Sequence, residues 1–277
     1  MKLVSKIKQG CWRASVPLRT AFAKRGGFFS ENDRRLWALK DKHVGRDAVV
    51  IGMGPSLRPE DLERFSGMVS FACNKIYLAY EQTSWRPDYY SVVDVLVAEN
   101  NRQEIANLKG STKIFPMRLR ARLPDMPEAL FFHNASSMKS RLNDPCFPNN
   151  PLEGVVSGGA TVLIPLVQMA FWMGCQRIYI VGLDFSFEVP ENTEEEAGTG
   201  RTILRCEGEV NHFHKDYRKP GERWTVPRME QQELAFAFAR EALEADGREI
   251  INASRVSKLN VLPRRDFESI FGGKVAH

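Results

Sequence analysis

The chain has 277 residues, of which 43% are hydrophobic and 26% are charged, and these values are ordinary for a globular protein. Its longest apolar stretch, residues 160–172, is shorter than the roughly 20 residues that span a bilayer, so we expect no transmembrane helix. The basic N-terminus lacks the apolar segment of a secretory signal, which predicts a cytoplasmic protein. Five cysteines without C-x-x-C or zinc-finger spacing argue against structural zinc and a disulfide framework.

Residues 1–30 contain seven Lys and Arg residues and no Asp or Glu, so the net charge of +5 resides in this segment. Basic and apolar side chains alternate over residues 1–28, as in segments that lie on an anionic membrane surface. The alternative is an irregular arm or one that docks on the core. We predict a basic arm and lead-in over residues 1–44, and a peripheral position on the inner face of the cell membrane. The near-neutral remainder, without a basic stripe, argues against nucleic acid as a partner.

Short apolar runs rich in β-branched residues begin at Ala48 and alternate with helical stretches, which is typical of buried parallel strands. We expect strands at residues 48–51, 69–72, 89–93, 113–115, 130–132, 177–181 and 249–251. Helices are expected at residues 59–65, 98–108, 160–173 and 228–245. The alternation predicts one α/β domain over residues 45–277, with a doubly wound, mainly parallel, Rossmann-like sheet. Proline at 145–151 and glutamate, proline and glycine at 188–200 predict irregular segments, with a mobile loop over about 188–205.

The turn after the first expected strand reads Gly-Met-Gly-Pro-Ser-Leu over residues 52–57. Glycines allow the backbone to approach a phosphate closely, and the N–H groups of the helix that follows favour an anion. The alternative is a tight strand–helix turn with no ligand. The dinucleotide-binding fingerprint is excluded because the third glycine is missing. Asn74 and Asp184 also follow expected strands, at the edge where ligands bind in open α/β sheets.

Five motifs follow one another along the chain: residues 52–57, Cys73-Asn74, Ser157-Gly158, a strand that ends in Gly182-Leu183-Asp184-Phe185, and His212-Phe213. This series resembles the bacterial CMP-sialic acid-dependent sialyltransferases of the GT-A-like variant fold, and also the flagellin-modifying motility accessory factors. It is equally similar to proteins related to archaeal 6-hydroxymethylpterin diphosphokinase, the MptE-like group. The resemblance covers about residues 46–255 and implies a sialyltransferase-like α/β fold.

The resemblance also implies roles for single residues. It makes Gly52, Gly54, Pro55 and Ser56 the loop for the nucleotide phosphate and ribose, Asn74 a donor contact, and Ser157 and Gly158 the base pocket. Asp184 lies near that pocket as a second candidate catalytic residue. His212 aligns with the general base of the sialyltransferases. Its chemistry suits that role, because an imidazole with an ordinary pKa of about 6.5 can accept a proton at neutral pH. Tyr217 is a candidate contact for the phosphate leaving group.

Three functions remain open from the sequence. The leading one is a nucleotide-sugar-dependent glycosyltransferase, with a CMP-activated acidic sugar as donor and a surface glycan or lipid-linked glycoconjugate as acceptor. Met53 and Ser186 stand where the sialyltransferases have asparagine and tyrosine, so the donor sugar is left open. The alternative is an MptE-like diphosphokinase that moves pyrophosphate from ATP to a pterin-like hydroxymethyl group, with Asp94 holding Mg²⁺. The third is a non-catalytic nucleotide-binding module. The sequence indicates neither the oligomeric state nor metal dependence.

Overall fold

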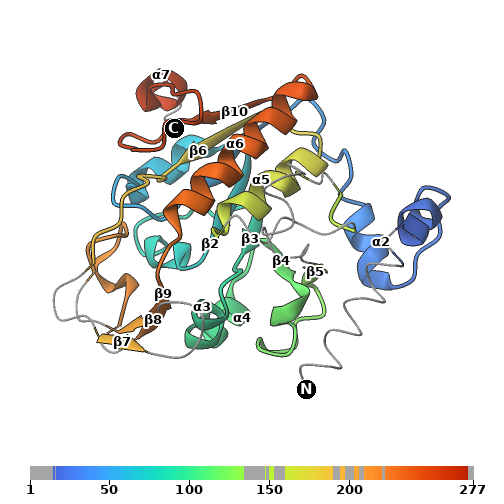
Figure 1. Ribbon diagram of the computed structural model, residues 1–277, viewed down its shortest axis with the longest axis horizontal. Helices are drawn as coiled ribbons and strands as arrows, with labels where there is room; N and C mark the ends of the chain where they lie inside the picture. Colours follow the sequence, from blue (N-terminus) through green and yellow to red (C-terminus); the bar gives the residue numbers. More distant parts are fainter. Residues whose placement is uncertain are drawn as a thin grey trace.

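The computed structural model describes residues 15, 17–133, 147, 150–152, 160–189, 194–196, 203–205, 209–219 and 222–273. Its centre is a seven-stranded sheet in the order β10-β6-β1-β2-β3-β4-β5, in which every neighbouring pair is parallel (Figure 1). The strands are β1 (Asp47–Ile51), β2 (Val69–Cys73), β3 (Tyr89–Ser91), β4 (Thr112–Pro116), β5 (Leu130–Phe132), β6 (Arg177–Val181) and β10 (Glu249–Asn252). The seven expected strands and the Rossmann-like fold class are confirmed.

The strand order fixes where a ligand can bind. From β1 the chain moves outward through β2 to β5, and then returns to place β6 on the other side of β1. The order therefore reverses between β1 and β6. In open α/β sheets the crevice at the carboxyl ends of the two strands flanking such a reversal is the usual ligand site.

Helices cover the sheet and are short except for two. The long helices α5 (Leu163–Trp172) and α6 (Met229–Ala245) lie side by side over one face of the sheet, where α5 contacts β1 and β2 and α6 contacts β10 (Figure 1). Phe65 packs against Phe267 and Phe271, and Phe271 also contacts Tyr179 of β6. The shorter elements are α2 (Glu31–Trp37), η1 (Pro59–Phe65), η2 (Ile76–Ala79), α3 (Val95–Asn100), α4 (Arg102–Asn107), η3 (Met117–Leu119), η6 (Lys215–Tyr217) and α7 (Phe267–Phe271).

Two expected helices differ in detail. Residues 59–65 form a 3₁₀ helix, η1, and residues 98–108 are divided into α3 and α4 at Asn101. Asn101 donates its side-chain amide to the carbonyl of Val97 over 2.8 Å, and its φ of −126° is not helical. Asparagine breaks a helix in this way because its side chain competes with the backbone for local hydrogen bonds.

A second, antiparallel sheet occupies the region that we expected to be an irregular loop over residues 188–205. It contains β7 (Glu194–Glu196), β8 (Ile203–Arg205) and β9 (Arg223–Thr225), in the order β7-β8-β9. The sequence analysis therefore missed two short strands within the segment that it predicted to be a mobile loop. Local composition did not reveal the strands because their pairing with β9 comes from a part of the chain about 20 residues away. The proline-rich residues 145–151 lie largely outside the described residues.

The lead-in to the first strand is packed on the edge of the sheet at β5. Ala23, Leu36 and Leu39 belong to the same hydrophobic core as the strands. The side chain of Asn32 donates to the carbonyl of Phe131 and accepts from its N–H, each over 2.8 Å, which joins α2 to β5. Among the described residues, none of the helices is long and apolar enough to cross a membrane.

Candidate active site at the reversal of strand order

The loops that follow β1 and β6 cross at very short range. Gly52 donates its N–H to the carbonyl of Val181, and Gly54 donates to that of Gly182, each over 2.8 Å. A Cβ atom on Gly52 would lie 2.5 Å from the carbonyl oxygen of Gly182, and one on Gly182 would lie 2.5 Å from that of Gly52. Gly182 also has a φ of +64°, a backbone conformation that residues with a side chain rarely adopt. The structure therefore requires glycine here for the crossing of the two main chains.

Asp184 holds the loop after β1 in place. Ser56 donates its N–H to Oδ2 of Asp184 over 2.8 Å and its hydroxyl to Oδ1. Burial raises the pKa of Asp184, while the two hydrogen bonds from Ser56 oppose that rise. The N–H groups of Gly52, Gly54 and Ser56 are thus donated within the protein, and Pro55 has none. The role of this loop in binding a nucleotide phosphate remains a prediction.

A cover segment, residues 209–219 and 222–225, returns over the carboxyl ends of β1 and β2. Phe213 donates its N–H to the carbonyl of Met53 over 2.9 Å, which ties the segment to the loop after β1. The rings of His212 and Tyr217 are stacked, with centroids 3.7 Å apart and planes within 7°. Asn74 lies near the hydroxyl of Tyr217, which is buried and has no hydrogen-bond partner among the described residues, and burial raises the pKa of Tyr217. Asn74, which follows β2, therefore lies together with His212 and Tyr217 of the cover segment.

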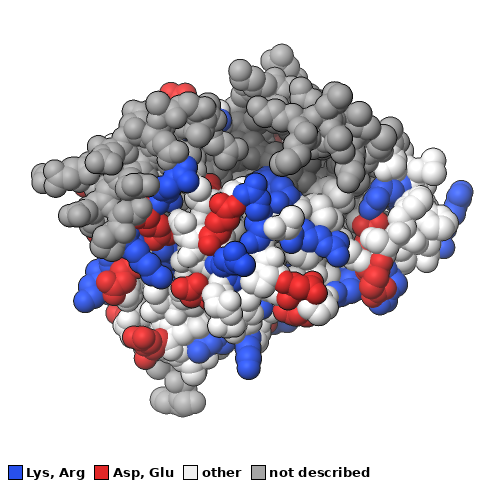
Figure 2. Space-filling view, turned by 90° about the horizontal axis from the view of Figure 1, so that it is seen from below, with Lys and Arg blue, Asp and Glu red and all other residues white. Residues whose placement is uncertain are grey.

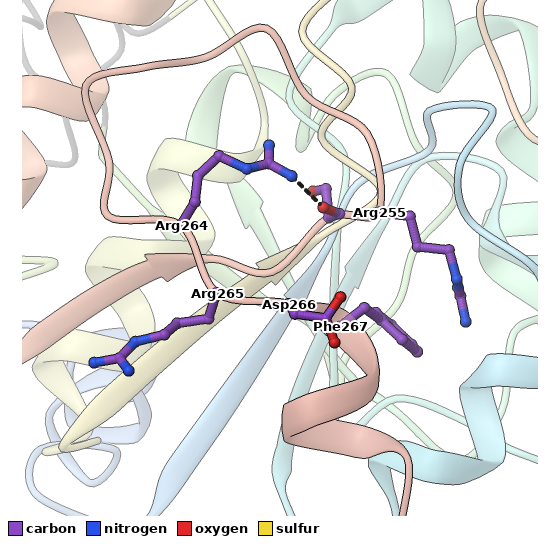
Figure 3. A pocket seen from close by; sticks show the side chains of 6 residues that line it. Arg255, Arg264, Arg265, Asp266 and Phe267 are labelled. Carbon is purple, nitrogen blue, oxygen red and sulfur yellow. Dashed lines mark hydrogen bonds between the residues drawn. The ribbon is translucent and has the colours of Figure 1, made fainter.

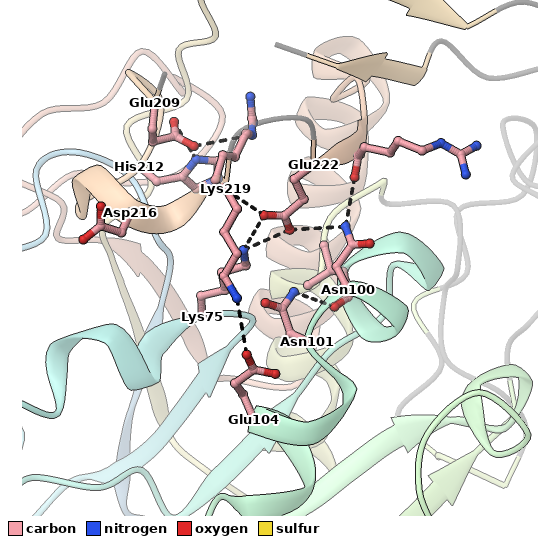
Figure 4. Close-up of polar contacts among 12 residues, drawn as sticks. Lys75, Asn100, Asn101, Glu104, Glu209, His212, Asp216, Lys219 and Glu222 are labelled. Atoms are coloured by element: carbon pink, nitrogen blue, oxygen red, sulfur yellow. Dashed lines mark hydrogen bonds and ion pairs between the residues drawn. The ribbon is translucent and has the colours of Figure 1, made fainter. Parts of the chain in front are cut away.

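His212 faces a buried carboxylate. Its Nδ1 lies 2.9 Å from Oε1 of Glu209, whose side chain is fully buried, whereas 22% of the His212 side chain is exposed (Figure 4). The two atoms are close but not aligned for a hydrogen bond. Contacts of this kind in active sites often tighten only when substrate is bound. Nε of Arg218 lies 3.4 Å from the other oxygen of Glu209.

The charges of this pair follow from its surroundings. Burial would raise the pKa of Glu209, but His212 and Arg218 hold it below its ordinary value. Burial lowers the pKa of His212, and the nearby carboxylate of Glu209 opposes this without reversing it. At neutral pH the pair is therefore an ionised carboxylate and a neutral imidazole. The carboxylate favours the tautomer with the proton on Nδ1, which leaves the lone pair on Nε2 to accept a proton.

A buried ion pair fastens the far end of the cover segment. Nζ of Lys75 lies 2.9 and 2.8 Å from the two carboxylate oxygens of Glu222, and both side chains are almost completely buried (Figure 4). Glu222 also accepts the N–H of Lys219 and the side-chain amide of Asn100. Burial lowers the pKa of Lys75, whereas Glu222 opposes that effect. This cluster joins the cover segment to β2 and α3.

Asp94 has contacts that a structural role explains. Its Oδ1 accepts the N–H groups of Leu96 and Val97 as the N-cap of α3, and its Oδ2 accepts the hydroxyl of Thr225 over 3.2 Å. Both carboxylate oxygens of Asp94 thus already accept hydrogen bonds. In the part of the chain that the structure describes, no three His, Cys, Asp or Glu residues are grouped as metal ligands. The role of Asp94 as a Mg²⁺ ligand remains a prediction.

Three further groups of residues belong to the description of this site: the predicted base pocket, His214, and the residues that the sequence did not indicate. Ser157 and Gly158, the predicted base pocket, lie outside the described residues. His214 accepts the N–H of Asp216 on its Nδ1 over 3.2 Å and so caps η6. Glu209 and the Lys75–Glu222 pair were missed by the sequence analysis. The one local signal was the spacing of Glu209 three residues before His212, since Glu222 is 147 residues from its partner.

A cavity of about 160 Å³ lies after β10, between Ser254 and Phe267. Three arginines line it, but their guanidinium groups point in different directions (Figure 3). Arg255 binds Asp61 and Glu268, and Arg264 donates to the carbonyl of Ser254. The cavity therefore offers no convergent set of groups for a ligand.

The face on the side of α3, α4 and β9 carries both signs of charge. Acidic and basic side chains are interspersed over the white and coloured part of this surface (Figure 2). No broad area of a single sign is visible among the residues drawn there.

Comparisons with known proteins give one structural likeness and one family. The structure of the MAf glycosyltransferase from Magnetospirillum magneticum AMB-1 is similar to this chain with a TM-score of 0.48 and 14% identity. The similarity covers 84% of this chain but 37% of the other, and a likeness of this degree carries no argument about activity. No curated protein matched the sequence. The family described as 6-hydroxymethylpterin diphosphokinase MptE-like matches residues 29–190. Because that match covers more than half of the 277 residues, the chain belongs to the MptE-like family.

Proposed function

We propose that this protein is a nucleotide-dependent transferase in which His212 removes the proton from an acceptor hydroxyl. The observation that carries the proposal is the pairing of His212 with the buried Glu209 beside the loop after β1. An imidazole that is neutral at pH 7, lies beside a carboxylate and is placed at the ligand-binding edge of an α/β sheet has the properties of a general base. His212 lies beyond the residues that match the family, so its role rests on geometry and on the motif resemblance.

The preferred reaction is glycosyl transfer from a nucleotide sugar, with a CMP-activated acidic sugar as the first candidate donor. Nε2 of His212 takes the hydroxyl proton as the acceptor oxygen forms its bond to the anomeric carbon. The bond from that carbon to the nucleotide phosphate breaks, and the phosphate keeps the electron pair. Glu209 stabilises the imidazolium that results, as the carboxylate does in other histidine–carboxylate pairs. A surface glycan or lipid-linked glycoconjugate is the acceptor in this proposal.

The second candidate is diphosphoryl transfer from ATP to a hydroxymethyl group, which the description of the family favours. His212 would remove the same kind of proton in this reaction. Mg²⁺ is the metal that ATP chemistry would bring, and Asp94 the residue that would hold it. Asp94 would then have to exchange its contact with Thr225 for the metal. That cost is the reason for ranking this reaction second.

A binding screen separates the two candidates. We expect thermal unfolding to shift upward with CMP under the glycosyl-transfer proposal, and with ATP and Mg²⁺ under the alternative. A ligand at 100 times its dissociation constant adds about 2.7 kcal/mol to the free energy of unfolding, which a melting curve resolves easily. CDP, UDP and GDP, each with and without Mg²⁺, complete the set. The absence of a shift with every nucleotide would contradict both candidates.

Glu209 provides a test of the pairing itself. In Glu209→Gln the anionic carboxylate that raises the pKa of His212 is lost, so that pKa falls further below its ordinary value. The acid limb of the pH profile of kcat/KM, which lies below pH 6.5 in the wild type, should therefore move to lower pH. We expect kcat to fall by about 10², because the favoured tautomer is lost as well. Measuring the full profile distinguishes this from a general loss of folded protein.

Glu241→Gln is the matched control, because Glu241 lies on the exposed side of α6. Its pH profile and kcat should equal those of the wild type. An unchanged acid limb in Glu209→Gln would show that Glu209 does not act on His212.

A further inference from the structure

The helical residues 17–23 turn an apolar side away from the protein. Ala23 is buried in the core, whereas Leu18 is 69% exposed and Phe22 is 46% exposed. Phe29, 56% exposed, adds to the same surface, since its ring lies 5.3 Å from that of Phe22. Leu18 and Phe22 are four residues apart and so share one side of the helix. Large apolar side chains gathered on the surface in this way mark a contact site.

This surface is held in a fixed orientation. Arg19, on the inner side of the helix, forms an ion pair with the buried Asp33 of α2, and its guanidinium lies 5.6 Å from the centre of the Phe29 ring. α2 in turn is joined to β5 through Asn32. The helical residues 17–23 lie at the outer edge of the molecule next to α2, where the segment is dark blue in Figure 1.

The charged residues at the end of this helix are basic, and the first acid after Phe29, Glu31, is paired with Arg34. Lys24 and Arg25 follow the helix directly and are exposed. The chain from residue 1 to residue 30 contains seven basic residues and no acid. An apolar centre with a basic rim is complementary to a bilayer that contains anionic lipids, because apolar side chains enter the boundary between headgroups and acyl chains while the cations face the headgroups.

We propose that Leu18, Phe22 and Phe29, together with Lys24 and Arg25, form a docking surface for an anionic lipid bilayer. The proposal does not depend on the reaction that the protein catalyses. It differs from the expectation for the arm as a whole because it assigns the contact to five named side chains at the packed end of that segment. Docking through them would hold the β5 edge of the sheet towards the lipid.

The test is co-sedimentation of the full chain with vesicles of phosphatidylcholine, with and without phosphatidylglycerol. The wild type should bind the vesicles that contain phosphatidylglycerol. Each basic residue near an anionic surface changes binding by about fivefold, so Lys24→Gln/Arg25→Gln should weaken partitioning by about 25-fold. The variant Leu18→Ser/Phe22→Ser/Phe29→Ser should reduce it to the level seen with phosphatidylcholine alone.

The control is Val44→Ser/Val256→Ser, which removes two exposed apolar side chains outside the patch and should bind as the wild type does. Circular dichroism melts confirm that each variant is folded. The proposal is overturned if the wild type shows no preference for phosphatidylglycerol, or if the patch variants bind as well as the control. It is also overturned if the patch variants lower the mass in analytical ultracentrifugation without affecting vesicle binding, since the patch would then seat a second copy of the chain.

Discussion

Replacing His212 with alanine should lower turnover by about 10² to 10⁴ while the affinity for the nucleotide donor stays nearly unchanged. The imidazole acts on the acceptor hydroxyl in the transition state, so its loss affects the chemical step and not the binding of the donor. Turnover is measured with the donor that the binding screen identifies, and donor affinity is measured by calorimetry on the same preparation. A separation of the two quantities is the expected result.

His214→Ala is the control for this experiment, because the second histidine lies two residues away but caps η6 through its Nδ1. Its turnover should remain within about threefold of the wild type, since the loss of one capping contact acts on local stability and not on proton transfer. Full activity in His212→Ala would remove the general-base assignment. Weaker donor binding as its sole defect would do the same.

Glu222→Ala should lower the free energy of unfolding by about 3–5 kcal/mol. The substitution leaves the ammonium group of Lys75 buried at the end of β2 without its carboxylate partner. It also removes the acceptor for the N–H of Lys219 and for the side chain of Asn100. Urea unfolding at pH 7 measures the loss, and proteolysis within residues 209–225 reports whether the cover segment has detached from β2.

A double variant tests the physical reason. In Lys75→Met/Glu222→Leu neither charge is buried, so the protein should be more stable than Glu222→Ala despite carrying one more substitution. Glu244→Ala removes the exposed partner of Arg240 on α6 and should change the free energy of unfolding by less than about 0.5 kcal/mol. If Glu222→Ala were no worse than Glu244→Ala, the buried pair would not be what fastens the cover segment.

The parallel sheet could be predicted because burial on both faces leaves a simple trace in the sequence. The strands expected at residues 48–51 and 177–181 are short, mainly apolar runs; the observed β1 starts one residue earlier, at Asp47, and β6 has the expected bounds. The antiparallel sheet could not be found in this way. β7 consists of three glutamates, residues that are uncommon in strands, and its pairing with β8 alone identifies it as a strand.

The candidate site was predicted in its position but not in its contacts. The sequence places Gly52, Asn74 and Asp184 after strands, and the structure brings those strand ends to one edge of the sheet. The partners of these residues come from distant segments, and for that reason the sequence did not identify them. Asp184 was expected near a base pocket. In the structure it accepts a hydrogen bond from Ser56, which is 128 residues away in the sequence. Gly54 was expected to let a phosphate approach the main chain. In the structure its close neighbour is Asp184, since a Cβ atom on Gly54 would lie 2.7 Å from Oδ1 of that residue.

The crossing of the loops after β1 and β6 also bears on how this chain can change over evolutionary time. An alanine at Gly52 meets the carbonyl of Gly182, and an alanine at Gly182 meets the carbonyl of Gly52, so each obstacle is main chain and not a side chain. A steric conflict with a side chain can be relieved by a second substitution, but a main chain offers nothing to substitute. The two glycines should therefore persist together in every descendant that keeps this crossing, even where the residues between them and the rest of the loop diverge.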